Sequence, residues 1–180
     1  MLHTAKPAVF LDRDGTLIEE AHYCRDPALV RIFPGVPQAL GQLKEAGFQN
    51  VIITNQSGIG RGLFSEDEFQ AVQARVLELL GAGKIDATYF CADAPENPSR
   101  RRKPSPEMVL EAARDLGLDL AHSWLIGDKA LDVQCALNAG VSPILVQTGY
   151  GKEQSAAGAV FIAGDLLAAV DFILRNADGR

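Results

Sequence analysis

Short apolar runs alternate with amphipathic segments along most of the chain. The apolar runs are rich in Val, Ile, Leu and Phe, as is typical of buried strands, and lie at residues 8–12, 50–55, 86–91, 123–128 and 142–147, with a shorter candidate at 159–163. Helical spacing of apolar residues occurs between these runs, at residues 36–48, 65–83, 105–117, 130–140 and 165–175. This alternation predicts an α/β fold, a three-layer doubly wound parallel sheet with helices on both faces.

Local signals define the ends of two of the predicted helices. Ser65 and Glu68 have the spacing of a capping box, and Gly81 can end the helix that they begin. Ser105 is the expected cap of a later helix, with Pro106 in its first turn. These signals support helices at 65–83 and 105–117.

Polar residues follow the apolar runs at the points where the predicted strands stop. Ligands of such sheets bind beyond the carboxyl ends of the strands, so these residues are expected to gather at one site. They are Asp12 and Asp14 after the first strand, Thr54 to Ser57 after the second, Asp128 and Lys129 after the fourth, and Lys103 in the loop before a helix.

The residue types at these strand ends suit phosphoryl transfer. Two carboxylates such as Asp12 and Asp14 can divide the work between a nucleophile or metal ligand and an acid/base. Asp128 could complete an oxygen site for Mg²⁺, although it could also cap the following helix. Thr54 offers a hydroxyl and Lys103 a positive charge, which together favour positioning and charge neutralisation of a phosphoryl group. Taken alone, the two aspartates could equally form a turn.

Length, charge and cysteine content exclude some classes of protein. The 180 residues show no repeat or linker and suit one domain, residues 1–180. The net charge of −6 disfavours a nucleic-acid partner. Three widely spaced cysteines argue against a disulfide framework, and neither a signal peptide nor an uninterrupted membrane span is evident. We therefore expect a cytoplasmic protein without a membrane partner.

Four ordered segments resemble the motifs of the haloacid dehalogenase superfamily of phosphatases. They are "DRDGT", the threonine that ends "VIITN", the lysine of "RRKPSP", and "GDKALD". More narrowly, "FLDRDGT", "TNQSGIGRG" and "GDKALD" are similar to the D-glycero-D-manno-heptose 1,7-bisphosphate 7-phosphatases and their histidinol-phosphatase relatives. Lys129 favours the heptose branch. The resemblance implies an enzyme that acts on a small phosphorylated metabolite, within lipopolysaccharide precursor biosynthesis. No large insertion follows the first or the third predicted strand, so we expect a capless enzyme, and we expect it to be a monomer.

The resemblance also implies a role for each motif residue. Asp12 would attack phosphorus, and Asp14 would protonate the leaving oxygen and then activate water. Thr54 and Lys103 would hold the transferring phosphoryl group. Mg²⁺ would bind Asp12, the main-chain carbonyl of Asp14, and Asp128, while Asp132 would brace Lys103 or a metal-bound water.

Further residues near the motifs are candidates for contact with the rest of the substrate. Most of them follow the second strand or neighbour Lys103, and two lie in the segment after the first strand. The candidates are Glu20, Tyr23, Asn55, Gln56, Ser57, Arg61, Arg102 and Lys129.

One loop departs from the family pattern. Relatives often carry a zinc-binding loop of cysteines and a histidine after the third strand, whereas this chain reads "CADAPENPSRRRKP". Cys91 remains, and Asp93 is the nearest other possible ligand. Structural zinc normally needs four Cys or His ligands, so the sequence predicts no structural zinc.

Three other functions stay open at this level. Two keep the chemistry but change the substrate to histidinol phosphate or to a nucleic-acid 3′-phosphate end. The third is a non-catalytic phosphate-binding module, against which the complete set of motif residues argues.

Overall fold

Six parallel strands form the central sheet of the computed structural model, which describes residues 5–177. The strand order is β3-β2-β1-β4-β5-β6, and neighbouring strands pair in parallel throughout. The strands are β1 Lys6–Leu11, β2 Gln49–Asn55, β3 Ala87–Cys91, β4 Leu118–Gly127, β5 Ser142–Val146 and β6 Phe161–Ala163. The predicted parallel α/β sheet is confirmed, including the short strand near 161.

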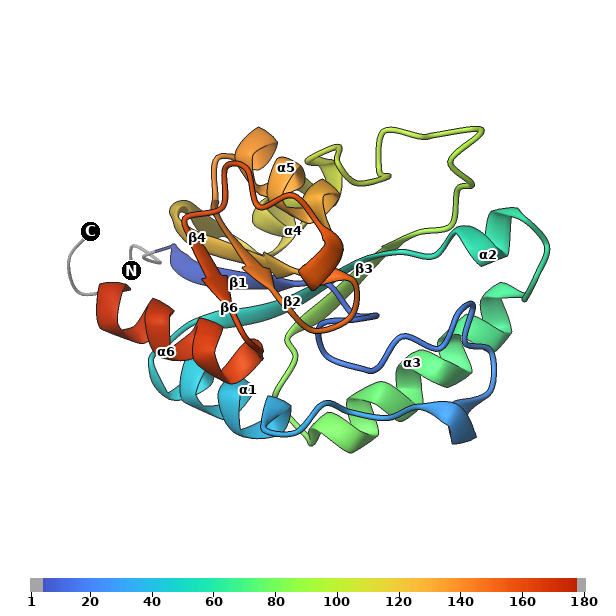
Figure 1. Ribbon diagram of the computed structural model, residues 1–180, viewed down its shortest axis with the longest axis horizontal. Helices are drawn as coiled ribbons and strands as arrows, with labels where there is room; N and C mark the ends of the chain where they lie inside the picture. The colour runs from blue at the N-terminus through green and yellow to red at the C-terminus, as the bar shows by residue number, and fades with distance from the viewer. Residues whose placement is uncertain (1–4, 178–180) are drawn as a thin grey trace.

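Helices cover the sheet on both faces (Figure 1). One face carries α1, α3 and α6, and the other carries α4 and α5. The helices are α1 Val36–Glu45, α2 Ser57–Gly60, α3 Glu66–Leu80, α4 Glu107–Leu116, α5 Ala130–Ala139 and α6 Leu166–Asn176, with short 3₁₀ turns at Pro27–Leu29 and Gly151–Glu153. Among residues 5–177, no helix has both the length and the apolar character needed to span a membrane.

The period-two alternation of side chains along β1 explains its uninterrupted apolar sequence. Val9 and Leu11 point into the core shared with α1, α3 and α6, while Ala8 and Phe10 point into the core beneath α4 and α5. All four are fully buried. A strand covered on both faces therefore carries no polar position until it ends.

The topology places a crevice at the end of β1. From β1 the chain proceeds outward to β2 and β3, then returns to β4 on the other side of β1 and continues to β5 and β6. Such a reversal of strand order opens a ligand crevice at the carboxyl ends of the two central strands. In this chain those ends are Asp12 after β1 and Asp128 after β4.

The sequence located most elements but not all of their ends. The capping box of Ser65 and Glu68 and the end of α3 at Gly81 are confirmed. The helix predicted to begin after Ser105 begins one residue later, since α4 starts at Glu107 with Pro106 at the cap position, but the Ser105 hydroxyl does accept from the Glu107 amide at 3.4 Å. The same hydroxyl donates to the Arg100 carbonyl in the preceding loop.

Two structural features were not predicted. β4 begins at Leu118, well before the predicted start at residue 123, and pairs with Lys6 and Pro7 across a register shift. Polar residues in this first part, including Asp119 and His122, mask the strand pattern. The loop after β2 contains the short helix α2, which glycine-rich composition alone did not indicate.

Candidate active site

Asp12 and Lys103 form the centre of a buried ionic network at the end of β1. The Lys103 ammonium donates to Asp12 Oδ1 at 2.8 Å, to Asp132 Oδ1 at 2.6 Å and to the Ile53 carbonyl at 3.1 Å. Burial alone would lower the pKa of Lys103, but the two carboxylates outweigh it and raise that pKa. Lys103 therefore stays charged, and the expectation that Asp132 braces Lys103 is confirmed.

Asn55 fixes the main chain at Lys103. Its side-chain amide donates to the Lys103 carbonyl at 3.1 Å and accepts from the Lys103 amide at 3.0 Å. This reciprocal pair joins the end of β2 to a loop 48 residues further along the chain. The lysine is thus held at the site from both its side chain and its backbone.

Asp14 has a different set of partners from Asp12. Arg13 donates through Nε to Asp14 Oδ2 at 2.9 Å and through its terminal nitrogen to Oδ1 at 3.1 Å. Gln56 donates to Asp14 Oδ2 at 2.8 Å and also to the Thr54 hydroxyl at 2.8 Å. Burial would raise the pKa of Asp14, yet Arg13 and Gln56 lower it below its ordinary value. In the free protein Asp14 is therefore ionised at neutral pH.

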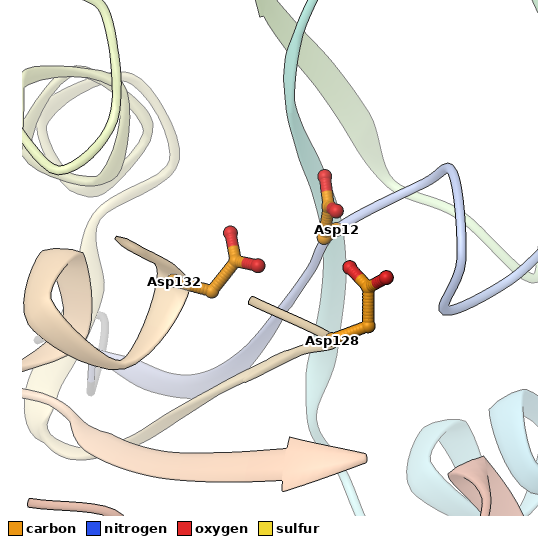
Figure 2. A group of neighbouring side chains, drawn as sticks. All are labelled: Asp12, Asp128 and Asp132. Carbon is orange, nitrogen blue, oxygen red and sulfur yellow. The ribbon is translucent and has the colours of Figure 1, made fainter. Parts of the chain in front are cut away.

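Asp128 lies beside Asp12 on the neighbouring strand end, and Asp132 follows on the first turn of α5 (Figure 2). One oxygen from each of these three carboxylates falls within 4.8 Å of the others. Burial and the charge of Asp12 raise the pKa of Asp128 to about 7. Its Oδ1 is buried without a hydrogen-bond partner, while Oδ2 accepts from the Tyr150 amide at 2.9 Å.

Asp128 does not cap α5, so that alternative is wrong. The helix begins after Lys129, whose amide donates to Asp132 Oδ2 at 3.1 Å. Both oxygens of Asp132 are therefore engaged, one by Lys103 and one by this amide. Asp128, with one unpaired buried oxygen, is the better candidate for binding a cation.

Two glycines allow the main chain to approach Asp128 closely. A Cβ atom on Gly15 would lie 2.2 Å from Asp128 Oδ2, and one on Gly149 would lie 2.3 Å from the same atom. Both residues also have positive φ angles, +87° and +53°, which other residues adopt at a cost. The Thr148 hydroxyl donates to the Gly15 carbonyl at 2.7 Å, which fixes the two segments together.

Two adjoining cavities open at this edge of the sheet. The smaller, of about 120 Å³, is bounded by Asp12, Thr54 and Lys103. The larger, of about 220 Å³, is bounded by side chains from the segment after β1 and from the segment near Tyr150. Asp14 borders both cavities, together with Asn55, Ser57 and Lys129.

The predicted substrate contacts occupy different parts of the site. Gln56, Glu20 and Tyr23 line the larger cavity, and Arg102 lines the smaller one. Arg61 lines neither cavity. It bonds the Tyr23 hydroxyl at 2.7 Å and Glu96 at 2.8 Å, and so ties together the loops at the rim.

Two site residues were not anticipated from the sequence. Arg13 lies between the two aspartates and is fully buried, and Tyr150 is brought in from the segment after β5. The Lys129 ammonium lies 5.0 Å from the centre of the Tyr150 ring. The local sequence around Tyr150 does not indicate that this residue lies at the site. For Arg13, its position between two acidic residues could have indicated a role.

The acidic group fits a divalent cation with oxygen ligands. Mg²⁺ binds through one or two carboxylates and completes its shell with water and phosphate oxygens. Asp12 and Asp128 provide two buried carboxylates at adjacent strand ends, and Asp128 Oδ1 has no other partner. A buried carboxylate without a partner is costly unless a cation binds it.

Comparison with known proteins is consistent with this class of site. A HAD-hydrolase-like family model matches residues 100–169. The D-glycero-D-manno-heptose-1,7-bisphosphate 7-phosphatase of Thermosynechococcus vestitus is 42% identical over 93% of this chain and 95% of its own length. The D-glycero-beta-D-manno-heptose-1,7-bisphosphate 7-phosphatase of Rhodopseudomonas palustris is 40% identical over 76% of this chain and 81% of its own.

A solved structure agrees with the fold over nearly the whole chain. The D,D-heptose 1,7-bisphosphate phosphatase from B. bronchiseptica, determined in complex with magnesium and phosphate, superposes with a TM-score of 0.86. It is 33% identical and covers 94% of this chain and 99% of its own. The chain therefore belongs to the haloacid dehalogenase-like family of phosphatases, as the sequence motifs predicted, and is a phosphoric monoester hydrolase.

Proposed function

We propose that this phosphatase removes the 7-phosphate of a D-glycero-D-manno-heptose 1,7-bisphosphate. The observation that carries the proposal is the pair of adjoining cavities with Asp14 on their shared border. The smaller cavity, beside Asp12, Thr54 and Lys103, suits the phosphoryl group being transferred. The larger one offers polar side chains to the remainder of a sugar. The names of the relatives support the same substrate class.

In the proposed reaction Asp12 attacks phosphorus and forms an aspartyl-phosphate, while the bond to the leaving oxygen breaks. Asp14 gives its proton to that oxygen, so the sugar leaves as an alcohol. Asp14 then takes a proton from water, which attacks phosphorus, releases inorganic phosphate and restores Asp12. Because Asp14 is ionised in the free protein, it takes up a proton from solvent when the negatively charged substrate binds, and it returns the proton gained from water to solvent after phosphate leaves.

Thr54 and Lys103 hold the transferring group in this account. Both are buried and both border the smaller cavity. Asp12, Asp128 and the main-chain carbonyl of Asp14 would hold Mg²⁺. Bound there, Mg²⁺ would neutralise charge on the phosphoryl oxygens.

The second phosphate of the substrate needs its own cationic partners. Arg102 lies at the edge of the smaller cavity, and its terminal nitrogen donates to the Asp93 carbonyl at 2.9 Å. Lys129 borders both cavities and remains charged, because nearby carboxylates raise its pKa against the effect of burial. We assign Arg102 the main contact with the distal phosphate, since a guanidinium can bind phosphate through two parallel hydrogen bonds. Arg102 borders the smaller cavity alone, so this assignment requires the sugar to fold back and bring its second phosphate to the edge of that cavity.

The loop after β3 carries no structural zinc in this account. Cys91 is buried, and its sulfur lies 3.4 Å from an Asp93 oxygen and 3.7 Å from the Ser99 hydroxyl. A carboxylate and a hydroxyl do not replace the missing cysteine and histidine ligands. Hydrogen bonds within the loop join Cys91 to Asp93 and Ser99.

A panel of phosphorylated metabolites tests the proposed substrate. We expect Mg²⁺-dependent release of phosphate from both anomers of the heptose 1,7-bisphosphate, with kcat/KM at least about a hundredfold above histidinol phosphate and 4-nitrophenyl phosphate, the scale of one or two lost charge-assisted contacts. The Asp12→Asn protein is the matched control for contaminating phosphatase. Preference for histidinol phosphate would overturn the substrate assignment, and inactivity on every substrate would indicate a phosphate-binding module.

The functional unit in this proposal is the monomer. All the residues assigned to the reaction lie within a single chain, at one edge of a single sheet.

A further inference from the structure

Arg13 lies between the two aspartates at the end of β1, but its side chain turns away from both cavities. It is 1% exposed and borders neither of the two cavities beside Asp12 and Asp14. Its guanidinium holds Asp14 through a two-point contact, at 2.9 Å to Oδ2 and 3.1 Å to Oδ1. A contact that engages both oxygens restricts rotation of the carboxylate as well as its position.

The outer side of the guanidinium is held by α3. It lies 5.2 Å from the centre of the Phe69 ring, and its remaining terminal nitrogen donates to Gln73 at 3.4 Å. Gln73 in turn donates to the Thr88 hydroxyl on β3 at 3.1 Å. Phe69 also packs on Phe90, with ring centres 4.5 Å apart. The outer side of Arg13 is thus fixed by α3, and β3 supports that helix through Thr88 and Phe90.

Asp14 has a third fixed contact, to Gln56, and that amide also binds Thr54. Even so, the Asp14 side chain keeps 16% of its surface exposed and borders both cavities. A carboxylate that served only as a counter-ion for Arg13 would not need to face the point where the two cavities meet. The contacts hold Asp14 at that point in one orientation.

We propose that Arg13 is a positioning residue, which holds the Asp14 carboxylate in the orientation required for proton transfer to the leaving oxygen. This inference rests on the acid/base role of Asp14 in the proposed function. Arg13 itself touches no substrate. Substitution of Arg13 should therefore slow the reaction most for substrates whose leaving group needs a proton, because a misplaced acid slows only the steps in which it transfers a proton.

Arg13→Lys tests the inference, since lysine keeps the charge but cannot make the two-point contact. The measurement is the single-turnover rate of leaving-group release, from a heptose bisphosphate and from 4-nitrophenyl phosphate, whose leaving group needs little protonation. We expect a loss of roughly 10- to 100-fold on the sugar phosphate and less than about threefold on the nitrophenyl ester. Arg75→Lys, at an exposed ion pair on α3, is the control and should change neither rate.

Asp14→Asn and the double variant separate this inference from the proposed function. If Arg13 acts through Asp14, the Arg13→Lys change should add almost nothing to the loss caused by Asp14→Asn on the sugar phosphate. Equal losses on the two substrates, or losses that multiply in the double variant, would overturn the role of Arg13 and leave the role of Asp14 intact. Absence of leaving-group dependence in Asp14→Asn itself would overturn the role of Asp14 and this inference with it.

Gln73→Met decides the question if Arg13→Lys does not fold. Methionine keeps the volume of the side chain and removes the oxygen that accepts from Arg13. We expect a loss of roughly two- to fivefold on the sugar phosphate alone, with the nitrophenyl rate unchanged. An equal loss on both substrates, or none on either, would contradict the inference.

Discussion

Asp12 and Asp14 are two residues apart, yet their surroundings give them different chemistry. Asp12 is buried against the Lys103 ammonium, whereas Asp14 is held by Arg13 and Gln56 at the junction of two cavities. The first arrangement suits a nucleophile beside a phosphoryl group. The second suits a group that exchanges a proton with the leaving oxygen.

A comparison of Asp14→Asn with Asp128→Ala tests this division of roles. Asp14→Asn should leave Mg²⁺ affinity within about threefold of the wild type, because its main-chain carbonyl is retained, whereas Asp128→Ala should weaken it at least about tenfold by loss of a carboxylate ligand. Isothermal titration with Mg²⁺ measures both. An equally large loss in the two variants would mean that the Asp14 side chain binds the metal.

Arg102→Ala tests the contact with the distal phosphate. We expect kcat/KM on a heptose 1,7-bisphosphate to fall roughly ten- to a hundredfold, the scale of one charge-assisted hydrogen bond of about 1.5–3 kcal/mol. The loss on a heptose 7-phosphate should be several-fold smaller. Equal losses would place Arg102 at the transferring phosphate, and no loss on either substrate would make Lys129 the next candidate.

Site residues could be predicted from the sequence where they lie at the end of a strand or directly after it. Asp12, Thr54 and Asp128 could be chosen because each comes at or just after the end of an apolar run, and a parallel sheet brings such ends together. The partners of Arg13 could not be chosen in this way. Phe69 and Gln73 lie on a helix more than 50 residues later, and only packing shows which side of that helix faces Arg13.

At the scale of elements, helix ends with reciprocal hydrogen bonds were predictable and irregular segments were not. The capping box at Ser65 depends on neighbours three residues apart, so the sequence contains the whole signal. The early start of β4 depends on pairing with Lys6 and Pro7, more than a hundred residues away. The segment near Tyr150 reaches Asp128 only because β5 lies beside β4.

The loop after β3 leads to a prediction about metal content. Protein purified without chelator should contain no stoichiometric zinc, because Cys91 has a carboxylate and a hydroxyl as neighbours in place of the usual ligands. Strong chelation should stop catalysis and leave the fold intact, as judged by elemental analysis and circular dichroism. One tightly held zinc per chain, released only on unfolding, would show that the loop binds metal through ligands that we have not identified.

For the molecule as a whole, the buried charge of Asp128 should reduce stability in the absence of metal. Burial raises the pKa of Asp128 to about 7 from an ordinary value of 3.8, so the folded state binds this proton more tightly than the unfolded state. Unfolding free energy should therefore fall as the pH rises from about 4 to about 7 in the presence of chelator. A bound cation would offset this loss of unfolding free energy.

Asp128→Asn tests whether the charge of Asp128 destabilises the protein in the absence of metal. In chelator at pH 8, the variant should be more stable than the wild type by about 1–3 kcal/mol, because a buried charge with one unpaired oxygen has been removed. It should also lose the part of the decline between about pH 6 and 7, whereas the raised pKa of Asp132, about 6, should maintain a decline at lower pH. Mg²⁺ should stabilise the variant less than the wild type. Urea denaturation at several pH values measures each effect. An unchanged pH profile would mean that the buried charge of Asp128 does not cause the fall in unfolding free energy.

Single-turnover kinetics of Asp12→Asn on a heptose 1,7-bisphosphate with Mg²⁺ test whether Asp12 is the nucleophile. The substitution is nearly isosteric, so we expect the circular dichroism spectrum of the folded protein to be retained. Leaving-group release should fall at least about a thousandfold, since the attacking carboxylate is lost. Release at close to the wild-type rate, with contaminating phosphatase excluded, would show that Asp12 is not the nucleophile.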